Sequence, residues 1–254
     1  MNKSKVIKTL ISVLILLLIW TTVTQLELVS SYVLPSPAKV WDSFLKMLQS
    51  GEIFEDIYIS YIRVLKGFFI ATFLAFLFAM VRVVLPKCND YYETILQFLK
   101  NVPPLSLISL LILWFGIGET TKIGIIVLTA FFPIYLNTVK GFVSCDKKLL
   151  EVGEIYGYSK VSSFFKIRLP YAMSDILVGM RIGLGYSWRA IISAEMIAAS
   201  TGLGHMILFA QQMSRTDKVI VGILVIGIVG YLTDRLFAII IDKSLKGSQE
   251  NGWD

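Results

Sequence analysis

The sequence has very few of the residues from which enzymes build reactive sites. It contains one histidine, His205, and two cysteines, Cys88 and Cys145, in 254 residues. The cysteines lie far apart, match no metal-binding or redox spacing, and are interpreted as reduced and without a role. No metal cluster and no activated serine is recognisable. We therefore expect no catalytic site, no cofactor and no metal, and a chain that is not itself an enzyme.

The sequence also lacks a phosphate-binding loop of the form Gly-x4-Gly-Lys-Ser/Thr. This absence excludes an ATPase site of that kind within the chain. If the protein does work at the expense of ATP, another polypeptide must hydrolyse the nucleotide.

Charge is scarce as well. Only 17% of the residues are charged, against about 25% in a soluble domain, while 56% are hydrophobic. The mean hydropathy is +0.72. The net charge of +6 does not indicate nucleic-acid binding, because the lysines and arginines lie at the ends of apolar segments, as the positive-inside rule describes. The sequence predicts an integral membrane protein that binds no nucleic acid.

Long apolar segments indicate an all-α, polytopic fold with about six transmembrane helices in a single domain, residues 1–254. The first segment is uncharged, too long for a signal-peptide core and without a cleavage site, so we expect a retained anchor. Lysines at both ends (Lys3, Lys5, Lys8, Lys243 and Lys246) predict cytoplasmic termini. The expected spans cover residues 9–26, 61–85, 91–115, 122–139, 174–199 and 218–241.

Several features interrupt this regular pattern. A short amphipathic helix over residues 40–48 is expected on the outer surface, and residues 86–90 are expected to form a cytoplasmic turn. Two prolines within Lys100–Pro104 must break or kink the third span, as a gate hinge or as a structural kink. Arg63, Lys66 and Arg82 lie near the ends of the second span, where their side chains could snorkel to the membrane surface. An outer loop is expected over 200–217.

A polar segment separates the fourth and fifth apolar segments. Glu151 and Glu154 are expected at the start of a short helix, where the helix dipole favours negative charge. Gly157 then interrupts, an amphipathic run follows, and Pro170 lies where a new helix could begin. Lysines and arginines outnumber acids around this segment, so we expect it in the cytoplasm. The alternatives are a surface for a partner or an ordinary basic loop with helix caps.

The spacing resembles the EAA motif of bacterial ABC-importer permeases, which reads Glu-Ala-Ala, three residues, Gly, nine residues and Ile-x-Leu-Pro. Glu151, Gly157, Ile167, Leu169 and Pro170 fall in register, while Val152 and Gly153 replace the two alanines. The resemblance implies that residues 151–170, here called the coupling segment, dock on an ATPase subunit.

The similarity extends over about residues 34–243 and indicates the subfamily of nitrate, sulfonate, taurine and bicarbonate importers, which includes thiamine-precursor permeases. It implies a type I importer in the bacterial cytoplasmic (inner) membrane, with two ATPase subunits, an extracellular or periplasmic substrate-binding protein and a second permease copy, most simply an identical one. Its matching residues are Ser36-Pro37, Arg63–Gly67, Pro103–Leu105, Trp114–Gly118, Phe132-Pro133, Leu136–Thr138, Gly141, Gly179–Ile182, Trp188, Ala194–Met196, Gly202–Gly204 and Gly230–Asp234.

The fifth segment is the least apolar and holds Arg181, Arg189 and Glu195. Ionisable residues within a span are costly and usually face a cavity or a partner. One hypothesis places Trp188, Arg189, Glu195 and Arg181 along the translocation path, with arginine suited to an anionic solute. The alternative is an ion pair with another helix, or snorkelling. The lone His205 of the outer loop could contact a partner or simply be solvated.

Two other classes of protein remain as alternatives. A secondary transporter or channel would often show internal repeats and deep coupling carboxylates, whereas Glu195 is the only deep acid here. A membrane enzyme would need a reactive set of side chains that the sequence lacks. Association with an ATPase discriminates the importer from the first alternative.

Overall fold

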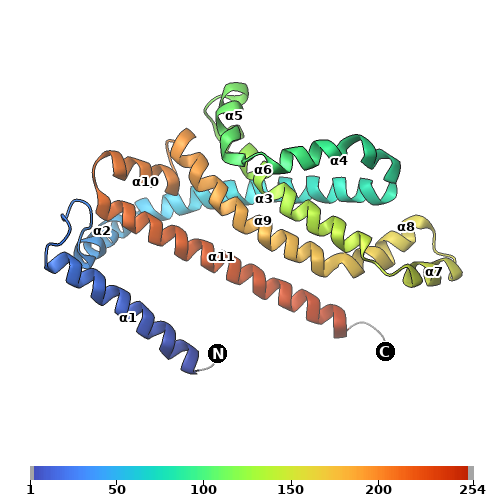
Figure 1. The fold of residues 1–254 in the computed structure, drawn as a ribbon, viewed down its shortest axis with the longest axis horizontal. Helices are drawn as coiled ribbons and strands as arrows, with labels where there is room; N and C mark the ends of the chain where they lie inside the picture. The colour runs from blue at the N-terminus through green and yellow to red at the C-terminus, as the bar shows by residue number, and fades with distance from the viewer. Residues whose placement is uncertain (1–2, 251–254) are drawn as a thin grey trace.

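The structure is a computed structural model that describes residues 3–250, and the side chains of residues 7–89 and 91–243. The side chains of Lys3, Lys5 and Lys246, on which part of the predicted orientation rests, lie outside these ranges. The described chain is all-α, as predicted, and contains no strand (Figure 1). Its helices are α1 (Lys3–Gln25), α2 (Pro37–Gln49), α3 (Glu52–Val84), α4 (Pro86–Asn101), η1 (Pro104–Leu107), α5 (Ile108–Phe115), α6 (Glu119–Val143), α7 (Lys147–Ile155), α8 (Lys160–Ser163), η2 (Phe164–Arg168), α9 (Leu169–Ala198), α10 (Leu203–Gln212) and α11 (Thr216–Glu250).

Within residues 3–250, four helices are long and apolar enough to cross a bilayer, and two bent helix pairs raise the number of possible spans to six. The four are α1, α3, α6 and α11. In the first bent pair, residues 91–101 and 104–115 meet at 97°, which confirms the predicted break at Lys100–Pro104. The second pair joins α9 to α10 at 46°. About six membrane-spanning segments therefore agree with the sequence analysis.

Helix α6 lies at the centre of the molecule, between α3 and α9 (Figure 1). Small residues let these helices approach closely, as is common in membranes. A Cβ atom on Gly67 would lie 2.5 Å from Ile126, and one on Gly183 would lie 2.6 Å from Ile134. Both isoleucines belong to α6 and are buried. The core is therefore a three-helix layer of α3, α6 and α9.

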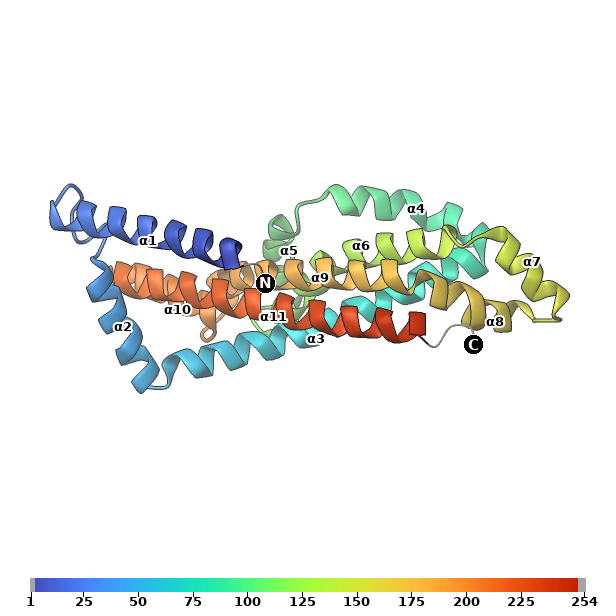
Figure 2. The same cartoon turned by 90° about the horizontal axis from the view of Figure 1, so that it is seen from below.

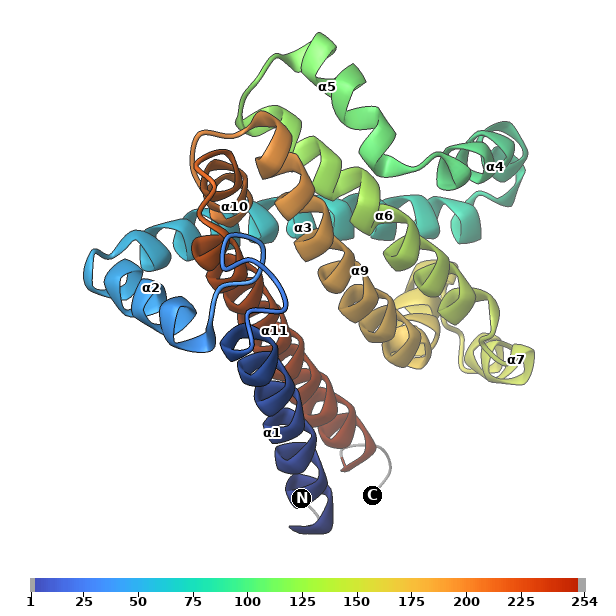
Figure 3. The same cartoon turned by 60° about the vertical axis from the view of Figure 1, so that its left-hand side comes forward.

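The two ends of the molecule differ in their elements. Figure 2 shows α2 and α10 near one end and α7 and α8 at the other. Helix α1 stands away from the core, and none of its span is buried. The Trp20 Nε1 group at its end donates to the Pro35 carbonyl at 3.0 Å. In Figure 3, α5 projects from the side of the core next to α6.

Three local predictions were wrong. Residues 86–90 form the first turn of α4 rather than a free turn, because proline is favoured at the first helical position. The expected outer loop contains a helix, α10, which begins after Gly202 and buries Leu203, Met206 and Ile207. The helix that carries the fifth span begins before residue 174, because the path from Lys160 to Ala198 is helical throughout.

The two thiols lie in different surroundings. Cys88 on α4 is exposed, whereas Cys145, between α6 and α7, is buried. Burial raises the pKa of the Cys145 thiol. Burial of Cys145 and its raised pKa both lower the concentration of accessible Cys145 thiolate at neutral pH.

We expect a maleimide to label Cys88 at least about tenfold faster than Cys145. The rates are measured on Cys88→Ser and Cys145→Ser, each of which keeps one thiol. Raising the pH from 7 to 9 should accelerate the labelling of Cys145, whose pKa is raised by burial. Equal rates at neutral pH would contradict the packing around Cys145.

Candidate functional site

The coupling segment folds as a short helix, a glycine turn and a second helix. Helix α7 begins after Asp146, whose carboxylate accepts from the backbone N–H of Lys148 at 2.9 Å. Glu151 and Glu154 therefore lie within α7, not at its N-terminus as predicted. Asp146 was not predicted as the capping residue, although Asp is among the commonest N-caps.

Gly157 ends α7 as the sequence indicated. Its φ is +74°, a left-handed conformation that glycine adopts without penalty. The N–H of Gly157 donates to the Glu154 carbonyl, and the N–H of Tyr158 to the Gly153 carbonyl, both at 2.9 Å. These two bonds form a Schellman motif, the common C-terminal cap of helices.

The second helix continues directly into the membrane. Ser159 caps α8 by accepting from the N–H of Ser162 at 3.2 Å. Residues 164–168 form a π-type turn, in which the N–H of Leu169 donates to the Phe164 carbonyl. Pro170 lies in the first turn of α9, as expected, but does not break the helix, because this wider turn precedes it.

The two helices of the coupling segment pack against each other. A Cβ atom on Gly153 would lie 2.6 Å from Ile167, so glycine at this position allows a close contact. Lys166 lies over the Tyr158 ring at 4.8 Å. The surface that remains is partly apolar, with exposed side chains at Val152, Ile155, Tyr156, Val161 and Phe165.

The four residues predicted along the translocation path do not lie together. Arg181 and Arg189 are exposed and line one cavity of about 410 Å³ between α9 and α11. Arg181 forms an ion pair there with Asp234 at 2.7 Å, whereas Arg189 lies over the Tyr186 ring at 5.5 Å. Trp188 and Glu195, by contrast, are buried.

Trp188 packs on Tyr61 of α3, with ring centroids 5.9 Å apart. His205 lies on α10 and stacks with Phe209 at 6.0 Å between ring centroids. No ion pair involving His205 occurs in the described part of the chain. These two aromatic contacts are packing interactions within one subunit.

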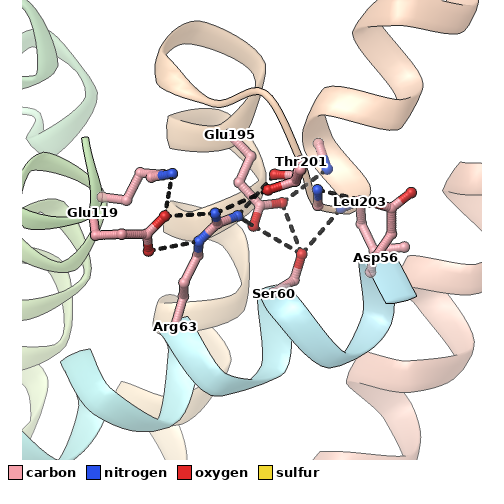
Figure 4. A network of polar contacts seen from close by, with 10 residues as sticks. Asp56, Ser60, Arg63, Glu119, Glu195, Thr201 and Leu203 are labelled. Atoms are coloured by element: carbon pink, nitrogen blue, oxygen red, sulfur yellow. Dashed lines mark hydrogen bonds and ion pairs between the residues drawn. The ribbon is translucent and has the colours of Figure 1, made fainter. Parts of the chain in front are cut away.

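Glu195 belongs to a buried network near the α10 end of the molecule (Figure 4). Its side chain is fully buried and accepts from Arg63 Nη1 at 2.8 Å and from Ser60 Oγ at 2.8 Å. Arg63 also holds Glu119 with two bonds of 2.6 and 2.9 Å and donates to the Thr201 carbonyl at 2.8 Å. Three helices, α3, α6 and α9, thus meet at one guanidinium group.

The same network fixes the start of α10. Three consecutive backbone N–H groups, those of Gly202, Leu203 and Gly204, donate to three side chains. The acceptors are Asp56 at 2.8 Å, Ser60 at 3.0 Å and Glu195 at 3.0 Å. These bonds satisfy groups that an α-helix leaves without partners at its N-terminus.

Glycine is required at both ends of this turn. Gly202 has a φ of +109°, and a Cβ atom there would collide with the Glu195 carboxylate. A Cβ atom on Gly204 would collide with the Ile192 carbonyl. The motif Gly202–Gly204 therefore lets the backbone approach the buried acid.

Sequence reasoning missed most of this network. Arg63 was expected to snorkel, but its side chain is only 6% exposed. The expectation was wrong because α3 begins at Glu52, so Arg63 lies more than two turns inside the helix. The spacing of Asp56, Ser60 and Arg63 places them on one helix face, a signal that the sequence did contain.

We expect Arg63→Ala to destabilise the protein by about 3 to 5 kcal/mol, because it leaves Glu195 buried without its charged partner. The measurement is thermal unfolding of the purified chain in mild detergent. The control is Lys46→Ala, which removes an exposed ion pair with Asp42 on α2 and should cost at most about 1 kcal/mol. Equal losses in the two variants would mean that the buried pair contributes no more than a surface pair.

Comparisons with known proteins are consistent with this geometry. The family model described as binding-protein-dependent transport system inner membrane component matches residues 67–246. The putative aliphatic sulfonates transport permease protein SsuC of Bacillus subtilis (strain 168) is 37% identical over 232 residues, which cover 91% of this chain and 84% of that protein.

Two further relatives are named for other substrates. The taurine transport system permease protein TauC of Escherichia coli (strain K12) is 32% identical, with 87% of this chain and 82% of the relative covered. The nitrate import permease protein NrtB of Synechocystis sp. (strain ATCC 27184 / PCC 6803 / Kazusa) is 30% identical, with 92% and 87% covered.

A solved structure shares the fold. It is an inward-facing conformation of the MetNI methionine ABC transporter, matched with a TM-score of 0.65 and 15% identity over 78% of this chain and 97% of that one. At this identity the likeness supports the fold alone.

Proposed function

Because the chain belongs to the family of binding-protein-dependent transport system inner membrane components and is the permease subunit of an ABC importer, we propose that it moves a small anionic solute by alternating access. The solute is delivered by an extracellular binding protein, and the energy comes from two ATPase subunits. The observation that supports this most directly is the coupling segment, a capped helix with an exposed apolar surface outside the spans.

The ATPase subunits dock on the coupling segment. Its exposed apolar side chains include Ile155 and Tyr156, which are 83% and 77% exposed. Apolar residues of this size, gathered on a short helix outside the membrane, are typical of a surface that a partner covers. Glu151 and Glu154 add exposed charge beside them, and Gly157, Ile167, Leu169 and Pro170 shape the segment.

One coupling segment per chain requires two permease chains for two ATPases. We propose a homodimer in the bacterial cytoplasmic membrane, with the coupling segment and both termini in the cytoplasm. Lysines that flank the described spans, Lys8 and Lys243, are consistent with this orientation.

The solute is a sulfonate, taurine, nitrate or similar anion. Relatives are named for sulfonates, taurine and nitrate. Arg189 suits such an anion, because it lies exposed in a cavity of about 410 Å³ on a membrane helix, and it forms no ion pair in the described part of the chain. Arg181 is held by Asp234 in the same cavity. Trp188 and Glu195 support this helix from its buried face.

We expect Ile155→Asp to abolish co-purification of the ATPase and the ATP hydrolysis that accompanies it, because it places a charge in an apolar docking surface. The assay is gentle-detergent purification of the chain from its own membrane, followed by identification of bound proteins. Ile117→Asp is the matched control, because Ile117 is 76% exposed but lies between α5 and α6, outside the coupling segment.

If an ATPase remains bound to Ile155→Asp as tightly as to the native chain, docking occurs elsewhere. If the native chain purifies alone and transports without ATP, the protein is a secondary transporter or channel.

We expect Arg189→Gln to lower uptake of the anionic solute by about tenfold or more, because one charge-assisted contact is lost. Arg189→Lys should retain part of the activity, since it keeps the charge but not the planar fork. Uptake is measured in cells that also produce the binding protein and ATPase. Unchanged transport by Arg189→Gln would remove Arg189 from the path.

A further inference from the structure

A second cavity lies at the α7 end of the molecule, beside the coupling segment, which contributes Arg168 to its lining. Its volume is about 310 Å³, and it opens to the surface between the end of α3, the start of α4, the end of α6, α7 and η2, which line it. Three of its described lining residues are cationic and none is acidic. The cations are Arg82, Lys147 and Arg168, and Asn89 adds an amide.

Two of these cations have no anionic partner in the structure. Arg82 donates to Glu93 at 3.1 Å, so part of its charge is already balanced. Lys147 and Arg168 form no ion pair within the described part of the chain. Nearby Asp146 does not line the cavity, and its carboxylate caps α7. The cavity therefore has an excess of positive charge.

The position of the cavity matches the surface of a bilayer. Two candidate spans end here, α3 at Val84 and α6 at Val143. The cations lie beyond or at these ends, while Phe142 and Leu150 contribute apolar wall. An apolar wall beside a cationic pocket fits a ligand with a phosphate group and an acyl chain, and basic pockets between membrane helices bind such headgroups.

Helix α7 separates this cavity from the proposed docking surface. At about 100° per residue, Lys147 and Leu150 lie about 60° apart on α7, whereas Val152 and Ile155 lie about 80° to 160° away from them. The docking surface and the cavity therefore lie on different faces of α7.

We propose that this cavity binds the phosphate of an anionic phospholipid headgroup at the cytoplasmic surface of the membrane. The side of the membrane rests on the proposed function, which places α7 in the cytoplasm. Arg168 and Lys147 contact the phosphate oxygens, and the acyl chains run along the ends of α3 and α6. The bound lipid holds α7 against the membrane helices.

The test uses the full chain, purified with whatever partners accompany it, in nanodiscs of phosphatidylcholine with or without phosphatidylglycerol. Native mass spectrometry counts the phosphatidylglycerol molecules that stay bound. Each cation near a membrane surface is worth about fivefold in affinity for an anionic lipid. We therefore expect Lys147→Gln/Arg168→Gln to lower retention by about 25-fold.

Two control variants separate this site from general basic charge. Lys148→Gln/Lys160→Gln removes two exposed lysines of the same region that do not line the cavity, and should retain the lipid. Lys147→Arg/Arg168→Lys keeps both charges and should also retain it. Equal retention by the native chain and Lys147→Gln/Arg168→Gln would overturn the proposal, as would an equal loss in the Lys148→Gln/Lys160→Gln control.

Two other outcomes would assign the cavity to a different ligand and would also overturn the phospholipid proposal. Displacement of the lipid by millimolar inorganic phosphate would show that the cavity takes a soluble phosphate. Loss of the ATPase, but not of the lipid, from Lys147→Gln/Arg168→Gln would assign the cations to the ATPase. Lipid retention with no ATPase present on the native chain would contradict the proposed coupling role but leave the lipid site intact.

Discussion

The buried guanidinium of Arg63 is the contact on which the α10 end of the structure depends. It neutralises Glu195, which is fully buried, and binds Glu119 at the start of α6. A buried charge is tolerated only when a partner and hydrogen bonds compensate its lost hydration. Because Arg63 binds two acids on different helices, it links α3, α6 and α9 at this end. The tight glycine turn before α10 follows from the same constraint.

Helix α9 joins this network to the coupling segment. It continues without interruption from α8, and its 30 residues span about 45 Å. A displacement of α7 that α9 transmits as a rigid rod would act on Glu195. The π-type turn at residues 164–168 is the one place between the two sites where the hydrogen-bond pattern departs from an α-helix in the described chain. Bending of the helical path from α8 to α9 therefore requires the least free energy at this turn.

The sequence predicted features that depend on local pattern. The number of spans follows from hydropathy. The break at Pro103 follows from the N–H group that proline lacks, and the turn at Gly157 follows from the backbone conformations that glycine can adopt. It did not predict features that depend on distant partners. Arg63 was expected at the membrane surface, since nothing near it in the chain indicates that Glu119 and Glu195 meet it. The start of α7 was misplaced because the acidic residues Glu151 and Glu154 were assigned to its first turn on the helix-dipole argument, whereas the helix begins after the N-cap Asp146.

The two ion pairs of Arg63, with Glu195 and with Glu119, differ in the free energy needed to separate them. Glu195 has no access to solvent, so separating it from Arg63 would leave a bare charge in the protein. The Glu119 side chain is 58% exposed and is also bound by Lys122 at 2.6 Å, so water and that lysine can replace the guanidinium. A helix rearrangement at this end would therefore release α6 from α3 before it releases α9 and α10. Arg63 therefore holds α9 more strongly than it holds α6.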